Sequence, residues 1–542
     1  MFGLNPGKMP STNASHNFTQ IPKAEIPRSS FDRSHGIKTA FDSGYLVPIF
    51  VDEVLPGDTF NLHATLFGRL STPLKPIMDN LYLDTFFFFV PNRLIWSNFK
   101  KFMGEQANPG DSISYLVPTI QSPADGWDVG TLFDYFGIPT KGQVAAGKKL
   151  TVSALWSRAY NLCWNEWFRD ENLQNAVTVD TGDGPDTAAD YVLLKRGKRK
   201  DYFTSALPFT QKGTAVSIPL GTSAPILGIG KYTQSFTEGP VSVYETGGSG
   251  SVSYTNASLM KSDINDHTWY AKGTGSSGYP DIRADLSNAT SATINSLRQS
   301  FQIQRLLERD ARGGTRYTEL VRSHFGVVSP DARLQRPELL SVSSAPVNIA
   351  PIPQTSVTGT TPQANLAGVG TVMASRGCGF VKSFTEHGVI IGLASVRADL
   401  NYQQGINRMW SRSTRYDFYW PALSHLGEQA ILNKEIYATD DTAAQDTNVF
   451  GYQERYAEYR YKPSLITGKL RSTASGTLDI WHVAQKFTSL PTLGDTFIKE
   501  TPPINRVQAV DTEPQILLDG YFKLKCARPM PVYSVPGLVD HF

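Results

Sequence analysis

The sequence predicts a mainly β protein of the sandwich or jelly-roll class, with a few helices and a surface insertion. Aromatic residues make up 11% of the 542 residues, together with 45 Gly and 34 Pro. Aromatic side chains favour strands, and Gly and Pro mark turns. Segments with a two-residue period outnumber helical ones, and they do not alternate with helices as a doubly wound sheet requires.

Residues 1–56 are expected to form an extended N-terminal arm. Each proline in this stretch removes a backbone donor and disfavours helix before it; these are Pro6, Pro10, Pro22, Pro27, Pro48 and Pro56. The first forty residues carry a mild excess of basic side chains. A segment with so little periodicity cannot fold alone, and we expect it to lie across a neighbouring surface.

Residues 57–211 are predicted to hold the first part of the core. Thr59–Leu70 alternates as a half-buried strand does, and residues 80–90 form a strand with two apolar faces. Residues 92–106 change to helical spacing. A clearer helix spans residues 155–168, where two adjacent i,i+4 rows of apolar side chains make a broad face that needs cover.

Residues 212–290 have a different composition, because Gly, Ser and Thr supply roughly two-fifths of them. Short strand-like pieces at residues 215–219, 241–244 and 251–254 are separated by turns. Long insertions of this kind lie on protein surfaces and often carry recognition. We therefore expect a surface insertion with its own loose structure.

Residues 291–542 are predicted to supply the remainder of the core and a C-terminal tail. Two helices are expected first, at residues 291–310 and 315–325. The inward-facing side chains of the first helix are predicted to be Ile294, Leu297, Phe301 and Leu307. Strands are predicted to follow at residues 372–375, 389–397, 478–487 and 515–525.

The sequence shows no catalytic constellation, and an enzyme is not predicted. The HExxH, GxSxG and Walker A patterns are absent. A carboxylate pair of the glycosidase type stays open, because spacing neither indicates nor excludes it. Cys163, Cys378 and Cys526 form no CxxC motif, which predicts neither a disulfide framework nor a zinc site.

No cofactor and no membrane insertion are expected. The stretch Asp263-Ile264-Asn265-Asp266 is permissive for calcium at an interface but lacks the EF-hand pattern. The most apolar run, residues 85–90, ends at Pro91 and is too short to span a bilayer. The first ten residues show no apolar segment of the secretory type, so we expect a cytosolic chain.

One strong basic run is a candidate DNA contact, formed by Lys195, Arg196, Lys198, Arg199 and Lys200. Clustered Lys and Arg bind phosphates, and the following Tyr202 and Phe203 suit base stacking. The alternatives are a solvated loop, an ion-pair site between subunits, or a loop whose two aromatic residues anchor it in the core.

The aromatic residues of the insertion are a candidate receptor surface, since exposed Tyr and Trp anchor protein and sugar partners. The candidates are Tyr232, Tyr244, Tyr254, Trp269 and Tyr270. The alternative is that these side chains hold the Gly- and Ser-rich insertion together.

Four segments carry a family resemblance: Ser34–Gln106, Lys195–Gly213, Arg316–Leu340 and Arg528–Phe542. The second reads KRGKRKDYFTSALPFTQKG and the last RPMPVYSVPGLVDHF. They are long, irregular and in family order, and the chain in this respect closely resembles the major capsid protein of gokushoviruses, a branch of the microviruses. The resemblance covers most of the chain apart from residues 212–290.

The resemblance implies an eight-stranded viral jelly roll with long insertions between strands. It implies a shell of sixty copies with T=1 symmetry around circular single-stranded DNA, assembled in the host cytoplasm and present in the virion. The insertion at 212–290 is then expected to gather at the threefold axes as a protrusion that meets a receptor on the bacterial surface.

The net charge adds a constraint on packaging. Sixty copies carrying +2 each supply only about +120, far less than the phosphate charge of a genome of several thousand nucleotides. Metal ions, polyamines or a separate protein must supply the rest, and the resemblance implies a small basic DNA-binding protein. The alternatives to a capsid protein are a sugar-binding β-sandwich and a hydrolase on a β scaffold.

Overall fold

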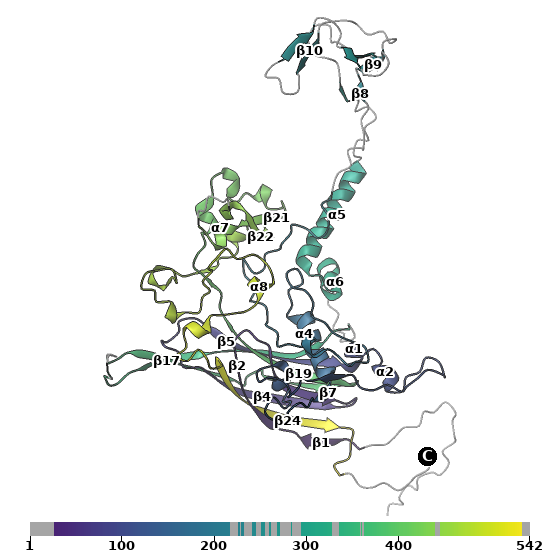
Figure 1. Cartoon of the computed structure of the whole chain (residues 1–542), viewed down its shortest axis with the longest axis vertical. Helices are drawn as coiled ribbons and strands as arrows, with labels where there is room; N and C mark the ends of the chain where they lie inside the picture. The colour runs from purple at the N-terminus through teal and green to yellow at the C-terminus, as the bar shows by residue number, and fades with distance from the viewer. Residues whose placement is uncertain are drawn as a thin grey trace, which may run out of the picture. The chain divides into compact units, whose positions relative to one another are not determined.

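The computed structural model (Figure 1) describes residues 27–216, 226–227, 229–231, 241–244, 251–254, 259–261, 268–271, 283–284, 294–327, 335–357, 359, 363–439 and 445–533. The chain divides into two compact units, one made of Met1–Pro208 with Val327–Phe542 and the other of Phe209–Gly326.

The first unit is built on two antiparallel sheets. One has the order β2 (His35–Phe41), β24 (Ile516–Arg528), β4 (Thr59–Leu70) and β17 (Leu366–Ala374). The other has the order β15 (Glu338–Pro346), β5 (Leu81–Pro91), β19 (Gly388–Ala398) and β3 (Val47–Val54). Strands from opposite ends of the chain lie side by side, as purple β1 and yellow β24 show in Figure 1. These two orders confirm the predicted jelly roll.

Three further strands extend the first sheet. β1 (Ser29–Asp32) continues the edge formed by β2, β18 (Gly379–Ser383) pairs with β4, and β16 (Asn348–Pro353) pairs with β17. The first sheet is therefore 7-stranded within the described residues, and the second is 4-stranded.

Burial in the strands follows the periods in the sequence. Buried and more exposed residues alternate along β4, as predicted for a half-buried strand. In β19 all eleven residues are buried, and β5 exposes only Tyr82 and Phe86 in part. The two central strands of the 4-stranded sheet are thus covered on both faces, as the two apolar faces of residues 80–90 predict.

Each face of that sheet carries its own apolar core. Phe87 and Ile390 belong to the core between the two sheets, together with Phe60 of β4 and Phe522 of β24. The neighbouring residues on the other face pack beneath helix α4 (Leu155–Trp167) and the short helices α1 (Asn92–Ile95) and α3 (Leu132–Tyr135). Helix α4 confirms the helix predicted at residues 155–168.

The N-terminal arm proves shorter than predicted. Of residues 1–56, those at 29–54 form β1, β2 and β3, and Phe41, Val47 and Phe50 are buried in the core. Pro48 lies within β3 because that strand is at the edge of its sheet, where a missing donor is tolerated. Residues 1–26 of the predicted arm lie outside the described residues.

The helix predicted at residues 92–106 is broken into α1 and α2 (Phe99–Phe102). Trp96 ends α1 in an extended conformation, with φ −148 and ψ 110. Its indole is buried, and Nε1 donates a hydrogen bond to the Asp183 carboxylate at 2.7 Å. That tertiary contact outweighs the local helical spacing.

The strand predicted at residues 478–487 is wrong. Asp479–Trp481 forms a single 3-10 turn, and the following residues are irregular. The Arg506 guanidinium donates to the carbonyl oxygens of His482 and Ala484 at 2.7 and 3.0 Å. A side chain therefore satisfies the groups that a partner strand would otherwise bind. The other strands predicted in this region correspond to β17, β19 and β24.

The second unit contains helices and short strands. Helices α5 (Ile294–Gly313) and α6 (Tyr317–Phe325) match the two predicted helices, but they belong to this unit and not to the core, where the sequence predicts them. Ile294 and Phe301, predicted to face inward, are 70% and 58% exposed within the chain. The short strands are β8 (Ile226–Leu227), β9 (Ile229–Lys231), β10 (Val241–Tyr244), β11 (Ser251–Tyr254), β12 (Leu259–Lys261), β13 (Thr268–Ala271) and β14 (Arg283–Ala284).

A third apolar cluster supports the long connection between β19 and β24, with Phe203, Ile431, Phe450 and Phe497 at its centre. The remaining strands and α-helices of the first unit are β6 (Thr119–Gln121), β7 (Thr151–Ser153), β20 (Asn401–Tyr402), β21 (Glu428–Leu432), α7 (Asn433–Ile436), β22 (Val449–Glu454), β23 (Ser464–Leu465) and α8 (Asp495–Ile498). Among the described helices, none has the length and apolarity to cross a bilayer.

Replacing Phe88 tests the helical cover of the 4-stranded sheet. The Phe88 ring is 1% exposed and lies 5.7 Å from the Trp167 ring and 5.9 Å from the Phe168 ring, measured between centroids. We expect Phe88→Ala to lower the free energy of unfolding of the isolated subunit by about 3–5 kcal/mol, because it leaves a cavity. Denaturant titration measures this loss.

Val381→Ala is the control for that measurement. Val381 lies on β18 and is 70% exposed, so its loss is expected to cost less than about 0.5 kcal/mol. Equal costs for the two variants would contradict the proposed role of the second core.

Candidate nucleic-acid strip and assembly surface

The predicted basic strip runs between two other segments of the first unit. The Arg196 N–H donates to the Gly44 carbonyl at 2.9 Å, and the Lys198 N–H donates to the Ile498 carbonyl at 2.7 Å. The Glu500 N–H returns a bond to the Arg196 carbonyl at 2.9 Å. Main-chain hydrogen bonds on both sides therefore make the strip part of the folded core.

Arg196 joins a buried charge cluster centred on Asp84 of β5. Its Nη1 lies 2.6 Å from Asp84 Oδ2, and Nε of Arg397, on β19, lies 2.8 Å from the same oxygen. The Ser344 hydroxyl donates to Asp84 Oδ1 at 2.5 Å. A carboxylate inside a sheet is expensive to bury unless it is paired and hydrogen-bonded. Arg196 supplies part of that pairing, and its charge is used inside the subunit.

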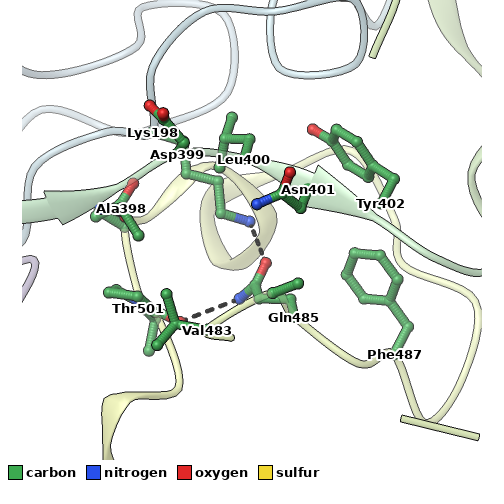
Figure 2. A pocket seen from close by; sticks show the side chains of 13 residues that line it. Lys198, Ala398, Asp399, Leu400, Asn401, Tyr402, Val483, Gln485, Phe487 and Thr501 are labelled. Carbon is green, nitrogen blue, oxygen red and sulfur yellow. Dashed lines mark hydrogen bonds between the residues drawn. The ribbon is translucent and has the colours of Figure 1, made fainter. Parts of the chain in front are cut away.

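Lys198 lies in a small hollow of about 20 Å³, shown in Figure 2. Its Nζ donates to Gln485 Oε1 at 2.6 Å, and Gln485 in turn donates to the Thr501 carbonyl at 3.3 Å. The Phe497 ring covers the ammonium at 4.4 Å. Burial lowers the pKa of Lys198 to about 8. The hollow has space for about one water, so a phosphate cannot reach this side chain here.

The remaining cations of the strip are more accessible. Lys195 lies over the Tyr45 ring at 4.8 Å, and Lys200 pairs with Asp170. Arg199 and Lys200 are 64% and 56% exposed at their side chains, and the nearest carboxylate oxygen to Arg199, on Asp399, lies at 3.8 Å. Contact with DNA stays a prediction, and Arg199 is the side chain best placed for it.

The two aromatic residues after the strip anchor it in the core. Tyr202 and Phe203 are 4% and 3% exposed, and the Tyr202 hydroxyl donates to Glu435 Oε2 at 2.9 Å. Neither ring presents a face for a base to stack on. The structure thus supports the anchoring alternative.

The predicted receptor residues are placed only by their backbone. Tyr244 and Tyr254 lie on the β10–β11 hairpin, and Trp269 and Tyr270 lie on β13 between β12 and β9. The orientations of their side chains lie outside the described part of the structure, as does Tyr232 altogether. Their role in receptor binding stays a prediction.

The chain segment that connects β19 and β24 carries an exposed surface that the sequence did not predict. We call it the aromatic platform and define it as Trp410, Tyr416, Phe418, Tyr419, Trp420 and Tyr459, which are between 49% and 77% exposed. The stretch from Arg415 to Trp420 reads RYDFYW, and this density of aromatic and arginine residues was the signal that could have revealed it.

The aromatic platform is held rigid by local contacts. The Arg412 guanidinium lies 4.3 Å from the Tyr459 ring and 5.4 Å from the Phe418 ring. Main-chain N–H groups of Thr414 and Ser413 donate to the Asp417 carboxylate, which lowers the pKa of Asp417 to about 2. Exposed aromatic side chains in fixed positions bind partners with little loss of entropy.

No group of three or more His, Cys, Asp or Glu side chains is arranged to hold a metal ion in the portion of the chain that the structure describes. The predicted calcium-permissive stretch, Asp263 to Asp266, falls outside that portion. An interface calcium ion at this stretch stays a prediction.

Comparison with known proteins identifies the fold's relatives. The family model described as capsid protein (F protein) matches residues 19–538. The chain is 48% identical over 546 residues to the capsid protein VP1 of Bdellovibrio phage phiMH2K, covering 99% of this chain and 100% of that protein. It is 45% identical over 597 residues to capsid protein VP1 of Chlamydia phage 1, covering 98% and 99%.

A third relative, capsid protein VP1 of Spiroplasma virus 4, is 37% identical over 557 residues, with 98% of this chain and 99% of that protein covered. These matches confirm the gokushovirus resemblance and extend over the whole length of the relatives. The chain therefore belongs to the F-protein family of phage capsid proteins, as a structural protein of the virion and not an enzyme.

Proposed function

We propose that sixty copies of this chain assemble into a T=1 icosahedral shell around circular single-stranded DNA. Membership of the capsid family and the jelly roll support a shell built from copies of one chain. The aromatic platform is the observation that carries the proposal for this particular chain, because an isolated subunit leaves large apolar side chains in water. Permanent assemblies cover such surfaces with a neighbouring subunit.

The composition of the aromatic platform suits a contact between copies. Trp, Tyr and Arg dominate the binding energy of most protein interfaces. Trp410 is 77% exposed and lies on the 3-10 turn Arg408–Ser411, two residues before Arg412. An aromatic side chain in such a position fills a pocket on its partner.

Substitution of Trp410 tests the platform's role in assembly. We expect Trp410→Ala to raise the protein concentration needed for shell formation roughly 30-fold, the effect of a hot-spot tryptophan worth about 2 kcal/mol. Negative-stain microscopy and light scattering across a dilution series measure this. Trp410→Phe keeps an aromatic ring and is expected to assemble much closer to the unchanged chain.

Two results would oppose this proposal. A chain that stays a monodisperse monomer under all conditions removes shell assembly altogether. If Trp410→Ala forms shells at the same protein concentration as the unchanged chain, shell assembly stands but the platform is not part of the contact between copies.

We also propose that the shell encloses its genome with help from a small basic protein of the same phage. The net charge of +2 per chain leaves most phosphates unpaired, and two of the five strip cations are committed inside the subunit. Arg199, 64% exposed, is the candidate for a direct phosphate contact.

The salt dependence of DNA retention tests this contact. We expect Arg199→Gln to reduce the slope of log affinity against log salt by about 0.7, the value for one phosphate of single-stranded DNA. Arg199→Lys keeps the charge and is expected to keep the slope. Nuclease protection of the enclosed DNA at increasing salt provides the measurement, and an unchanged slope in Arg199→Gln would remove Arg199 from the DNA contact.

We propose, finally, that the insertion at residues 212–290 mediates attachment to a receptor on the bacterial host and forms the threefold protrusion. Its support is that residues 209–326 form a compact unit of their own, inserted in the chain between β5 and β15 of the jelly roll. A separate unit can change its binding surface without disturbing the strands of the shell.

Deletion of residues 215–288 tests the attachment role. Shells of the deleted chain are expected to form and to lose adsorption to host cells, because the strands of both sheets are untouched. Adsorption is measured as the fraction of particles that sediment with the cells. Adsorption at the level of the unchanged particle would refute a receptor role.

A further inference from the structure

Strand β2 has one paired and one open edge. It pairs with β24 from His35 to Phe41, and within the described residues no strand pairs with its other edge. The Arg33 N–H donates to the Leu524 carbonyl at 2.9 Å. Since main-chain groups alternate sides along an antiparallel strand, Ile37 and Thr39 also face β24, and Gly36, Lys38 and Ala40 face outward.

A side-chain contact confirms which main-chain groups of β2 face away from β24. The Tyr135 hydroxyl donates to the Ala40 carbonyl at 3.0 Å from the side opposite β24. The main-chain groups of Gly36 and Lys38 point the same way, and both residues are exposed. An open edge of this kind can accept another strand.

A groove lies along the open edge. Its volume is about 1050 Å³, and its lining includes β2 from Ile37 to Phe41 together with the segment from Trp127 to Tyr135. Trp127, Leu132 and Phe133 are buried beside it, and Val129 on its lining is 76% exposed. Apolar walls beside unpaired main-chain groups are the combination that binds an extended peptide.

The charges of the groove favour a cationic occupant. Its lining carries the carboxylates of Asp42, Asp128 and Asp134 against the ammonium of Lys38. Lys38 is itself paired with Asp519 at 3.1 Å, and Lys141 pairs with Asp128 at 2.7 Å. A negative balance remains, which draws basic peptide segments and repels acidic ones.

The chain supplies a segment with matching properties. Residues 1–26 carry Lys8 and Lys23 against Glu25, and these charges flank residues 11–21, which contain no Lys, Arg, Asp or Glu. Residues 11–21 contain no proline, and positions 13–19 alternate between one face with Ala14, His16 and Phe18 and one with Asn13, Ser15, Asn17 and Thr19. Although the arm as a whole shows little periodicity, these seven positions have the two-residue period of a strand, with Ala14 and Phe18 on one face.

The exit point of that segment is known. The Arg28 guanidinium donates to the Gly57 carbonyl and to the Thr59 hydroxyl, each at 2.5 Å. β1 starts at Ser29, opposite Arg528, whereas the groove flanks the end of β2 that pairs with Ile516. The chain thus leaves at the far end of the edge, about 33 Å from the groove at the usual rise per residue. From there an extended arm can cross to another subunit without retracing β1 and β2.

We propose that residues 11–21 of a neighbouring copy add as a strand to the open edge of β2 and place Phe18 in the groove. The inference rests on the proposed self-assembly, which it deepens by naming one contact. Main-chain hydrogen bonds to Gly36 and Lys38 hold the added strand, and the apolar walls bind its alternate side chains. Each copy gives one arm and receives another.

Cross-linking in assembled shells tests this proposal. Val129→Cys on the groove and Asn17→Cys on the arm are combined, and shells are treated with a short bis-maleimide. The native cysteines Cys163, Cys378 and Cys526 are buried and do not compete. Denaturing gels are expected to show a ladder of dimers and larger oligomers, and the two single-cysteine chains are expected to stay monomers.

A pair of variants at Lys38 isolates the strand contact. Lys38→Pro removes an outward N–H without breaking the ladder to β24, and is expected to lower the cross-link yield several-fold. Lys38→Ala keeps the N–H and is expected to keep most of the yield. Equal yields in the two variants would contradict strand addition.

Other outcomes also decide against the proposal. Intact shells with no cross-link, or with a cross-link confined to single chains, overturn the exchange of arms between copies. Removal of residues 2–26 from the Val129→Cys chain is expected to expose the introduced thiol to maleimide. If shells of that shortened chain protect the thiol as fully as before, the groove has another occupant. Failure of the unchanged chain to form shells is seen by microscopy and overturns the assembly proposal itself.

Discussion

The burial of β5 and β19, the central strands of the 4-stranded sheet, on both faces is the constraint on which the rest of the fold depends. Every residue of β19 is buried, so this sheet cannot serve as an outer wall. One face closes the sandwich against β4 and β24, and the other needs helix α4 and the segments around it. The long connection after β5 therefore contributes to the core, since it brings α4 to the sheet.

The same constraint explains the basic strip. After helix α4 the chain crosses the face of the 4-stranded sheet that α4 covers. Asp84 lies on that face and needs positively charged side chains as partners. Arg196 and Arg397 supply them at 2.6 and 2.8 Å. The basic strip resembles a phosphate site in sequence, but Arg196 and Lys198 make buried contacts within the subunit. Arg199 remains exposed to solvent. The surface available for partners lies instead in exposed features: the aromatic platform, α5 and the open edge of β2.

Prediction succeeded where local periodicity and packing demand the same conformation. β4 matches its predicted bounds because its alternate side chains face the core and the solvent. α4 matches because its two rows of apolar side chains face one sheet. Prediction failed where the contacts of one side chain override the local sequence period. Trp96 interrupts the helix between α1 and α2, and Arg506 binds the carbonyls of His482 and Ala484 in place of a partner strand. The aromatic platform was missed because exposure is not visible in a list of aromatic residues.

The sequence by itself determined the β class, the family, the main strands and the principal helices, because these follow from patterns repeated over many neighbouring residues. Only the tertiary structure decided that residues 29–54 are strands and not arm, because their partners in β24 and β19 are hundreds of residues away. It also decided which cations of the strip are buried and which edge of the sheet stays open. Those outcomes depend on long-range pairing and desolvation, which no local pattern encodes.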